Sequence, residues 1–283
     1  MAPIHFDLVK EVFRGAGYNL ELLPSTDHDA VEAGLRYVNN DICYPSILVT
    51  GQIMEAIESG RYDLSKTAVV ISQTGGGCRA TKALRESGHP EIPVISLSAV
   101  ALGEDNPGFK ITPAMLKQAV YAVLFGDVMM QMLYRCRPYE ATPGAANALY
   151  EEYMARARKL APKFNRHNYT KLCREAIRAF DSMPLVGEGT KPRVGVVGEI
   201  YIKYSPLGNN NLESFLLSEG AEPVVPGLTD FIIFKIYNRE VDVGIYGGKW
   251  IKKKACQLLK GYVEKCQRAM IAAMERSGFR APG

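Results

Sequence analysis

Long apolar segments are missing from this 283-residue sequence. No stretch reaches about 18 consecutive apolar residues, the length that a membrane-spanning helix needs, and no charged-then-apolar leader opens the chain. The charge is also modest, because the net value is +4 and the basic residues are spread along the chain. We therefore expect a soluble, cytoplasmic protein that binds neither a membrane nor nucleic acid.

Closely spaced cysteine pairs are missing as well. Six cysteines in a chain without a signal peptide favour thiols or metal ligands over structural disulfides. No Cys-x-x-Cys pair occurs, which argues against a zinc ribbon or a ferredoxin-type site. Any metal site must therefore combine cysteines that are far apart in the sequence. The four histidines have no metal-ligand spacing, and only His5 is expected to face a ligand crevice.

Apolar, β-branched runs alternate with helical periodicities along the chain. Strands are expected at 19–23, 67–72, 94–97, 193–197 and 222–225. Helices are expected at 6–16, 43–59, 78–86, 169–180 and 212–218, and a helical stretch over 112–161 is interrupted near Pro138 and Pro143. The segment 198–211 is expected to be a loop. This alternation predicts an α/β fold with parallel sheets.

The predicted architecture has two doubly wound, Rossmann-like units with a helical insertion. Residues 1–111 form the first unit, 112–190 the helical insertion, and 191–283 the second unit with a C-terminal helix. The second unit opens with a strand, whereas the first begins almost directly in a helix. We therefore expect that the chain is a piece of a longer protein, or one part of a split one, without its opening strand.

Two cysteines, Cys43 and Cys78, each follow a strand-like run and open a helix. A thiolate at a helix N-terminus faces unpaired N–H groups and the positive end of the helix dipole, which favours its ionised form. Both turns are expected at the same edge of one sheet, which suits an anion, a metal cluster or thiol chemistry. The alternative is that both cysteines are small buried hydrophobic residues. The side chains of Asn39, Asn40 and Asp41 can cap the helix after Cys43 or order the loop before it.

Three glycines, Gly75, Gly76 and Gly77, precede Cys78 and allow a close backbone approach to a bulky group. They match neither a Walker A loop nor a dinucleotide fingerprint, so nucleotide binding has little support. Arg79 is either a counter-charge for a cluster or a CoA phosphate, or a surface residue. Cys136 is the reserve ligand, because Arg135 and Arg137 would favour its thiolate.

The remaining cysteines and one polar loop are less specific. Cys173, Cys256 and Cys266 lie in helical stretches and are expected to be packing or surface residues. The loop 198–211 offers side chains for a ligand or a partner domain, or for capping the helix that follows. Its polar members are Glu199, Lys203, Tyr204, Asn209, Asn210 and Asn211.

Several motifs in fixed order resemble those of a known family. They are YVNNDICYPSILVTGQ, SQTGGGCRAT, NPGFK, YRCRPYE and VGVVGEIYIKYSPLGNNNLESFLLSEGAE. Over essentially the whole chain they are similar to the 2-hydroxyacyl-CoA dehydratase component D group. The similarity is specifically to the C-terminal region of the large CoA-substrate-specific enzyme activase fusion proteins.

The resemblance implies an iron–sulfur protein. Cys43 and Cys78 would be ligands of a [4Fe–4S] cluster or a double cubane, and an ATP-hydrolysing activator would deliver low-potential electrons to it. Relatives dehydrate a 2-hydroxyacyl-CoA or reduce small molecules, and they continue into a further segment with cysteines. The resemblance therefore implies that this chain lacks a third ligand, which a missing segment, a partner subunit or Cys136 would supply.

Three functional interpretations remain open from the sequence. The first is an iron–sulfur reductase or dehydratase component that works with the activator. The second is an acyl-CoA-binding subunit without its own cluster, and the third is a non-catalytic docking or scaffold fragment. The ATPase motifs of the fusion proteins are absent, so ATP hydrolysis is not assigned to this chain.

Overall fold

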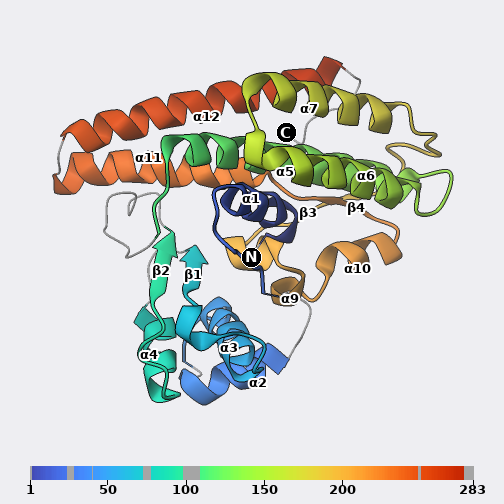
Figure 1. Cartoon of the computed structure of the whole chain (residues 1–283). Helices are drawn as coiled ribbons and strands as arrows, with labels where there is room; N and C mark the ends of the chain where they lie inside the picture. The colour runs from blue at the N-terminus through green and yellow to red at the C-terminus, as the bar shows by residue number, and fades with distance from the viewer. Residues whose placement is uncertain are drawn as a thin grey trace. The chain divides into compact units, whose positions relative to one another are not determined.

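The fold is mostly helical, about 69%, and contains two small parallel sheets (Figure 1). The computed structural model describes residues 2–23, 29–39, 41–72, 78–97, 109–247 and 250–276. The mixture of helices and parallel strands agrees with the α/β class predicted from the sequence. Within these residues, no helix is both long and apolar enough to cross a membrane.

The chain divides into two compact units. Unit 1 combines Met1–Glu21, Pro113–Lys203 and Asn211–Gly283, whereas unit 2 combines Leu22–Thr112 and Tyr204–Asn210. Each unit contains one two-stranded sheet. Unit 2 therefore holds both Cys43 and Cys78, and unit 1 holds the other four cysteines.

Unit 2 is built around helices α3 and α4. Its elements are α2 (Asp29–Tyr37), α3 (Tyr44–Glu58), the 3₁₀ turn η1 (Leu64–Lys66), β1 (Val69–Ser72), α4 (Cys78–Glu86), β2 (Val94–Leu97) and α9 (Pro206–Asn209). Strands β1 and β2 are parallel, with Val69 opposite Val94. Ile53, Met54 and Ile57 of α3 share a buried cluster with α4, against which the apolar side chains of both strands pack.

Unit 1 is a layer of long helices with a short sheet. Its elements are α1 (Pro3–Gly15), α5 (Pro113–Cys136), η2 (Arg137–Tyr139), α6 (Ala145–Leu160), η3 (Ala161–Lys163), α7 (Arg166–Asp181), β3 (Arg193–Gly195), α8 (Ile200–Tyr204), α10 (Leu212–Ser218), β4 (Glu222–Val224), α11 (Leu228–Tyr246) and α12 (Trp250–Arg276). Helix α8 ends one residue beyond the unit boundary. Strands β3 and β4 are parallel, with Arg193 opposite Glu222.

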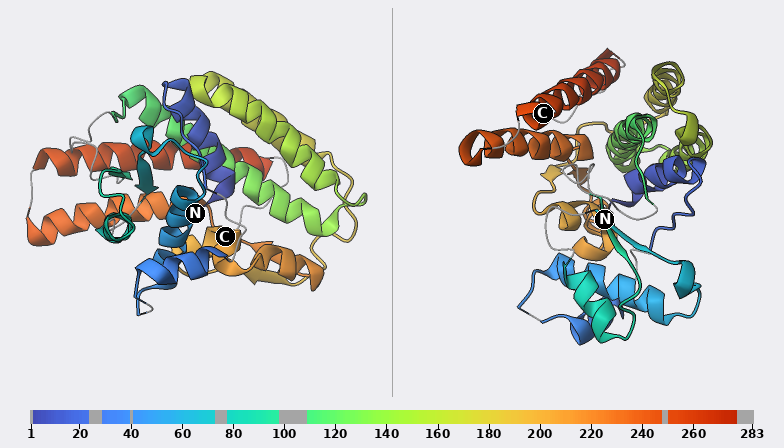
Figure 2. Two further views of the ribbon diagram at one scale, coloured as in Figure 1. Left: turned by 60° about the horizontal axis from the view of Figure 1, so that its bottom comes forward. Right: turned by 60° about the vertical axis from the view of Figure 1, so that its left-hand side comes forward.

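Helix α5 is the central element of unit 1. It contacts α1, α6, α7, α11, α12 and β4, and most of its middle turns are buried (Figure 2). The helix ends just before Pro138, whose ring cannot continue an α-helix. Helix α6 begins after Gly144, which adopts a left-handed φ of 85°. The predicted interruption near Pro138 and Pro143 is therefore confirmed.

Three predictions of local structure are wrong. Cys43 does not follow a strand, because helix α2 precedes α3, so Cys43 does not share with Cys78 a strand-to-helix turn at one sheet edge. No strand forms at 19–23, where the Leu20 carbonyl accepts from the Arg14 side chain and not from a neighbouring strand. The segment 198–211 is not a loop, because it contains α8 and α9. Glu199 accepts from the backbone N–H of Tyr201 and caps α8, and the Ser205 side chain caps α9.

Candidate functional site

Cys43 lies directly before the first residue of helix α3. Its backbone is extended, with φ −58° and ψ 136°, and its carbonyl accepts from the N–H of Ser46 at 2.9 Å. Its side chain is exposed, and Sγ lies 3.0 Å from the Ser46 hydroxyl oxygen. Pro45 occupies the second position of the helix, where no intrahelical N–H donor is needed. The thiol thus lies at the positive end of a 15-residue helix and faces solvent.

Of the three residues expected to cap α3 or to order the loop before it, Asn39 and Asp41 order the loop, and Asn40 lies outside the described residues. The Asn39 side chain donates to the Asp41 carboxylate at 3.5 Å, and the Asn39 carbonyl accepts from the N–H of Ile42. These contacts order the turn within itself. Cys43 therefore occupies the N-cap position of α3, as the sequence predicts.

Cys78 is the first residue of helix α4, as predicted. Its side chain and all of Gly75, Gly76 and Gly77 lie outside the described residues. Arg79, which follows it in the first turn of α4, is exposed. Helices α3 and α4 pack on each other and share the core of unit 2, so one compact unit supplies both cysteine-initiated helices.

Exposed thiols at helix N-termini have the donor chemistry that iron–sulfur clusters use. Such clusters are held by thiolates, and nearby hydrogen bonds and solvent exposure tune their reduction potential. Cys43 offers an exposed sulfur that such a cluster could bind. The hydroxyl of its neighbour Ser46 lies at hydrogen-bond distance from this sulfur. The exposed Cys43 sulfur therefore has the chemistry of a possible metal ligand.

Cys136 differs from what its sequence neighbours suggest. It is fully buried at the end of α5, and burial raises the pKa of its thiol to about 12. Arg135 does not offset this, since its guanidinium donates to Glu222 at 2.8 Å and to Glu188 at 2.9 Å. The expectation that two arginines favour the Cys136 thiolate is therefore wrong, because desolvation outweighs a cation that is already paired.

The other three cysteines lie in helices, as predicted. Cys173 is buried in α7, and burial raises the pKa of its thiol to about 12. Cys256 and Cys266 are half-buried in α12. Their positions suit packing roles.

His5 is buried, and the expectation that it faces a crevice is wrong. Only 1% of its surface is exposed, and its Nε2 lies 2.8 Å from Oδ1 of the fully buried Asp127 in α5. Asp127 also accepts from the backbone N–H groups of Leu228 at 2.6 Å and Thr229 at 3.0 Å, so it caps helix α11. Sequence reasoning missed this cluster, because its members are more than 100 residues apart.

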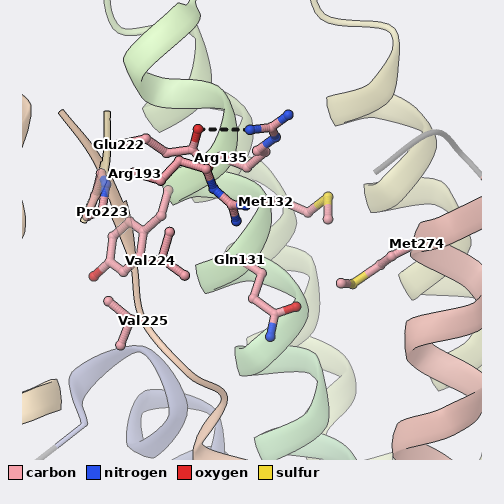
Figure 3. A pocket seen from close by; sticks show the side chains of 10 residues that line it. Gln131, Met132, Arg135, Arg193, Glu222, Pro223, Val224, Val225 and Met274 are labelled. Carbon is pink, nitrogen blue, oxygen red and sulfur yellow. Dashed lines mark hydrogen bonds and ion pairs between the residues drawn. The ribbon is translucent and has the colours of Figure 1, made fainter. Parts of the chain in front are cut away.

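A second polar cluster surrounds Glu222 at the start of β4. Its buried carboxylate accepts from Arg135 at 2.8 Å (Figure 3). It also accepts from Arg193 at 3.2 Å and from the Tyr139 hydroxyl at 3.0 Å. Arg135, Arg193 and Glu222 line a cavity of about 30 Å³, enough for one or two waters and far too small for a cofactor. This cluster is at the amino ends of the strands, whereas ligands of α/β sheets bind beyond the carboxyl ends. We assign it a structural role.

The geometry leaves the starts of α3 and α4 as the candidate functional site. Compared with known protein families, curated proteins and solved structures, the chain gives no match.

Proposed function

We propose that this chain is the iron–sulfur component of a low-potential reductase or dehydratase system related to 2-hydroxyacyl-CoA dehydratase. In this proposal Cys43 and Cys78 hold the cluster, and an ATP-hydrolysing activator protein is the electron donor. The substrate is a CoA thioester or a small molecule. The strand pairs β1–β2 and β3–β4 are then parts of two doubly wound sheets.

One observation carries the proposal: both cysteines open helices that share the core of unit 2. A helix N-terminus favours negative charge, so each position suits a thiolate ligand better than a cysteine inside a helix does. Cys43 also has the exposure that a cluster accepting electrons from another protein requires. The motif resemblance adds the identity of the cluster and of the electron donor.

The protein's own residues would hold the cluster and balance its charge. Cys43 and Cys78 supply thiolates, the Ser46 hydroxyl bonds the Cys43 sulfur, and the exposed Arg79 adds a positive charge next to Cys78 in the sequence. When bound, an iron–sulfur cluster accepts and passes on single electrons. Two cysteines leave a cluster incompletely ligated, so a further thiolate would come from another segment or from a partner subunit, since Cys136 is fully buried and burial raises the pKa of its thiol to about 12.

The test is anaerobic reconstitution of the purified chain with iron and sulfide. Iron and acid-labile sulfide per chain, together with electron paramagnetic resonance of the reduced sample, are measured for the parent, Cys43→Ala and Cys78→Ala. Cys256→Ala is the matched control, because Cys256 is a half-buried thiol of unit 1. We expect about four iron per parent chain, a loss in both unit 2 variants and no change in the control.

Two outcomes would contradict the proposal. Equal iron content in the parent and both variants would place the metal elsewhere. No iron in the parent would mean that the chain does not carry a cluster by itself.

A further inference from the structure

Helices α7 and α12 lie next to each other and both pack on α5 in unit 1 (Figure 1). Tyr121 of α5 connects them, because its ring stacks on Tyr169 of α7 with the centroids 4.8 Å apart and its hydroxyl accepts from Tyr262 of α12 at 2.8 Å. Figure 1 shows both helices running from this contact toward the same end of the unit. Each helix thus has one side packed inward and an opposite side that faces outward.

The outward side of α7 is basic. The buried side of this helix includes Tyr169 and Phe180. Lys171, Arg174 and Arg178 follow each other at spacings of three and four residues, which places them together on the opposite side of the helix. All three side chains are exposed.

The outward side of α12 is basic as well. Its buried side includes Val263 and Met270. Lys265, Arg268 and Arg276 lie on the opposite side, because their spacings of three and eight residues are close to one and two helical turns. These three side chains are also exposed.

These six cations have no carboxylate partner. Within the part of the chain that the structure describes, none of them makes an ion pair or a side-chain hydrogen bond. Other cations of unit 1 are paired, for example Arg135 with Glu222 and Arg158 with Asp7. We call the unpaired set the basic face, and its members are Lys171, Arg174, Arg178, Lys265, Arg268 and Arg276.

The acidic residues of the two helices do not neutralise the basic face. Glu175 is paired with an arginine of α6, and Asp181 is the last residue of α7. Glu264 and Glu275 lie on the side of α12 that carries Gln257, which bonds to α11. The two helices together have eleven basic and four acidic residues, a net charge of +7, whereas the rest of the chain has a net charge of −3.

The surroundings of the basic face decide which polyanion suits it. A membrane-surface helix needs an apolar side, but no large hydrophobic residue of α7 is exposed, and Leu258 of α12 lies two turns before Lys265. Trp250 precedes Arg268 by 18 residues, or five turns, so it lies on the same side of α12, and it is 70% exposed. The exposed Lys254 follows it by one turn. Cations that track a backbone, next to an aromatic side chain on which a base stacks, are typical of single-strand binding.

We propose that the basic face binds the phosphates of single-stranded nucleic acid and that one base stacks on Trp250. The expectation that the chain does not bind nucleic acid rested on the spread of basic residues along the sequence. The fold brings two of the basic segments together, and the proposal replaces that expectation. It concerns a surface of unit 1 and is independent of the proposed iron–sulfur function.

The test is a titration of a fluorescein-labelled oligothymidine of about 20 nucleotides with the full chain, followed by fluorescence anisotropy. This probe exceeds the usual site size of about 4–16 nucleotides. We expect saturable binding whose logarithm falls against the logarithm of salt concentration with a slope of about −4, since each neutralised phosphate of a single strand contributes about −0.7. The unlabelled oligonucleotide should quench the emission of Trp250, the single tryptophan of the sequence.

Two variants test the location. Arg174→Gln combined with Arg268→Gln should weaken binding by at least about tenfold and make the salt slope shallower by about 1.4. Trp250→Leu should weaken it by about fivefold or more and leave the salt slope unchanged. The matched control is Arg36→Gln combined with Arg85→Gln, which removes two exposed arginines of unit 2 and should bind like the parent. All of these positions are exposed, so circular dichroism should show unchanged helical content.

Four results would overturn the proposal. Absence of oligothymidine binding at low salt would exclude it directly. An equal loss in the arginine variant and its control would show a dependence on net charge and not on this face. Equally tight binding of polyglutamate would assign the face to acidic proteins, and binding of anionic lipid vesicles without oligothymidine binding would assign it to a membrane surface.

Discussion

Asp127 shows how one buried carboxylate connects distant segments. It accepts from His5 of α1 and from the first N–H groups of α11, which have no partners inside their own helix. The positive end of α11 also stabilises the negative charge. Asp127 therefore ties the beginnings of two helices to the middle of α5, and this bonding accounts for the burial of His5 and Asp127 together.

Replacing Asp127 should destabilise the folded protein. Asp127→Ala is expected to lower the free energy of unfolding by about 3–5 kcal/mol, because buried donors lose their charged acceptor. Asp127→Asn retains one acceptor oxygen and should cost less. Urea unfolding followed by circular dichroism measures both. Glu152→Gln is the exposed control and should stay within about 0.5 kcal/mol of the parent; a similarly small loss for Asp127→Ala would contradict the role of Asp127.

The thiols should differ in reactivity because only Cys43 among those compared is exposed. Burial raises the pKa of Cys136 and Cys173 to about 12, from an ordinary 9.0, and only a thiolate is alkylated. At pH 8, a short iodoacetamide pulse should label Cys43 and leave the two buried thiols unmodified, as read by peptide mass spectrometry. If Cys136 were labelled as fast as Cys43, burial would not be what controls the alkylation rate of these thiols.

The raised thiol pKa values of Cys136 and Cys173 also predict how the stability of the protein changes at alkaline pH. The unfolded thiols ionise near pH 9, whereas the folded ones stay protonated up to about pH 12. Ionisation therefore favours the unfolded chain, and the contribution of both thiols to stability should fall as the pH rises above 9. Cys136→Ala and Cys173→Ala should reduce this alkaline loss in urea titrations.

At the scale of elements, glycine decides how closely α2 and α3 approach. A Cβ atom on Gly51 would lie 1.6 Å from the Ala30 carbonyl oxygen, and one on Gly34 would lie 2.2 Å from the Ile47 carbonyl oxygen. Neither glycine has a positive φ, so space and not backbone conformation requires them. The start of α3, where Cys43 lies, is thereby held by close backbone packing in unit 2.

Two alanine substitutions should therefore act in opposite directions. Gly51→Ala is expected to destabilise the protein by about 3 kcal/mol, because a backbone oxygen cannot move aside as a side chain does. Gly261→Ala in α12 meets no atom within 4 Å and should stabilise it by about 0.5–1 kcal/mol through higher helix propensity. Urea midpoints measured by circular dichroism compare the two, and a shift of the same sign in both would refute the packing argument.

For the whole molecule, helices provide nearly all of the regular structure, and the single tryptophan lies on the surface. Urea should therefore abolish the helical dichroism while the Trp250 emission changes little. Acrylamide quenching should be nearly as efficient in the native protein as in the unfolded chain. A strongly protected Trp250 in the native protein would mean that another copy or another segment covers this side chain.

Local signals in the sequence were sufficient for many elements. The predicted strand at 94–97 and helix at 212–218 have the same bounds in the structure, since β-branched runs and helical periodicity act over a few neighbouring residues. The predictions for segments 19–23 and 198–211 were wrong because the secondary structure of both segments depends on which side chains bond to the backbone. Local pattern also missed α2 and α11.

The sequence by itself determined that Cys43 and Cys78 begin helices, because the preceding turn residues and the following periodicity are local properties. Only the tertiary structure decided that Cys136 is a buried, protonated thiol, that His5 bonds Asp127, and that one face of α11 is exposed. These features depend on contacts between residues far apart in the chain, and burial, which sets their charge and chemistry, exists only after those residues have packed together.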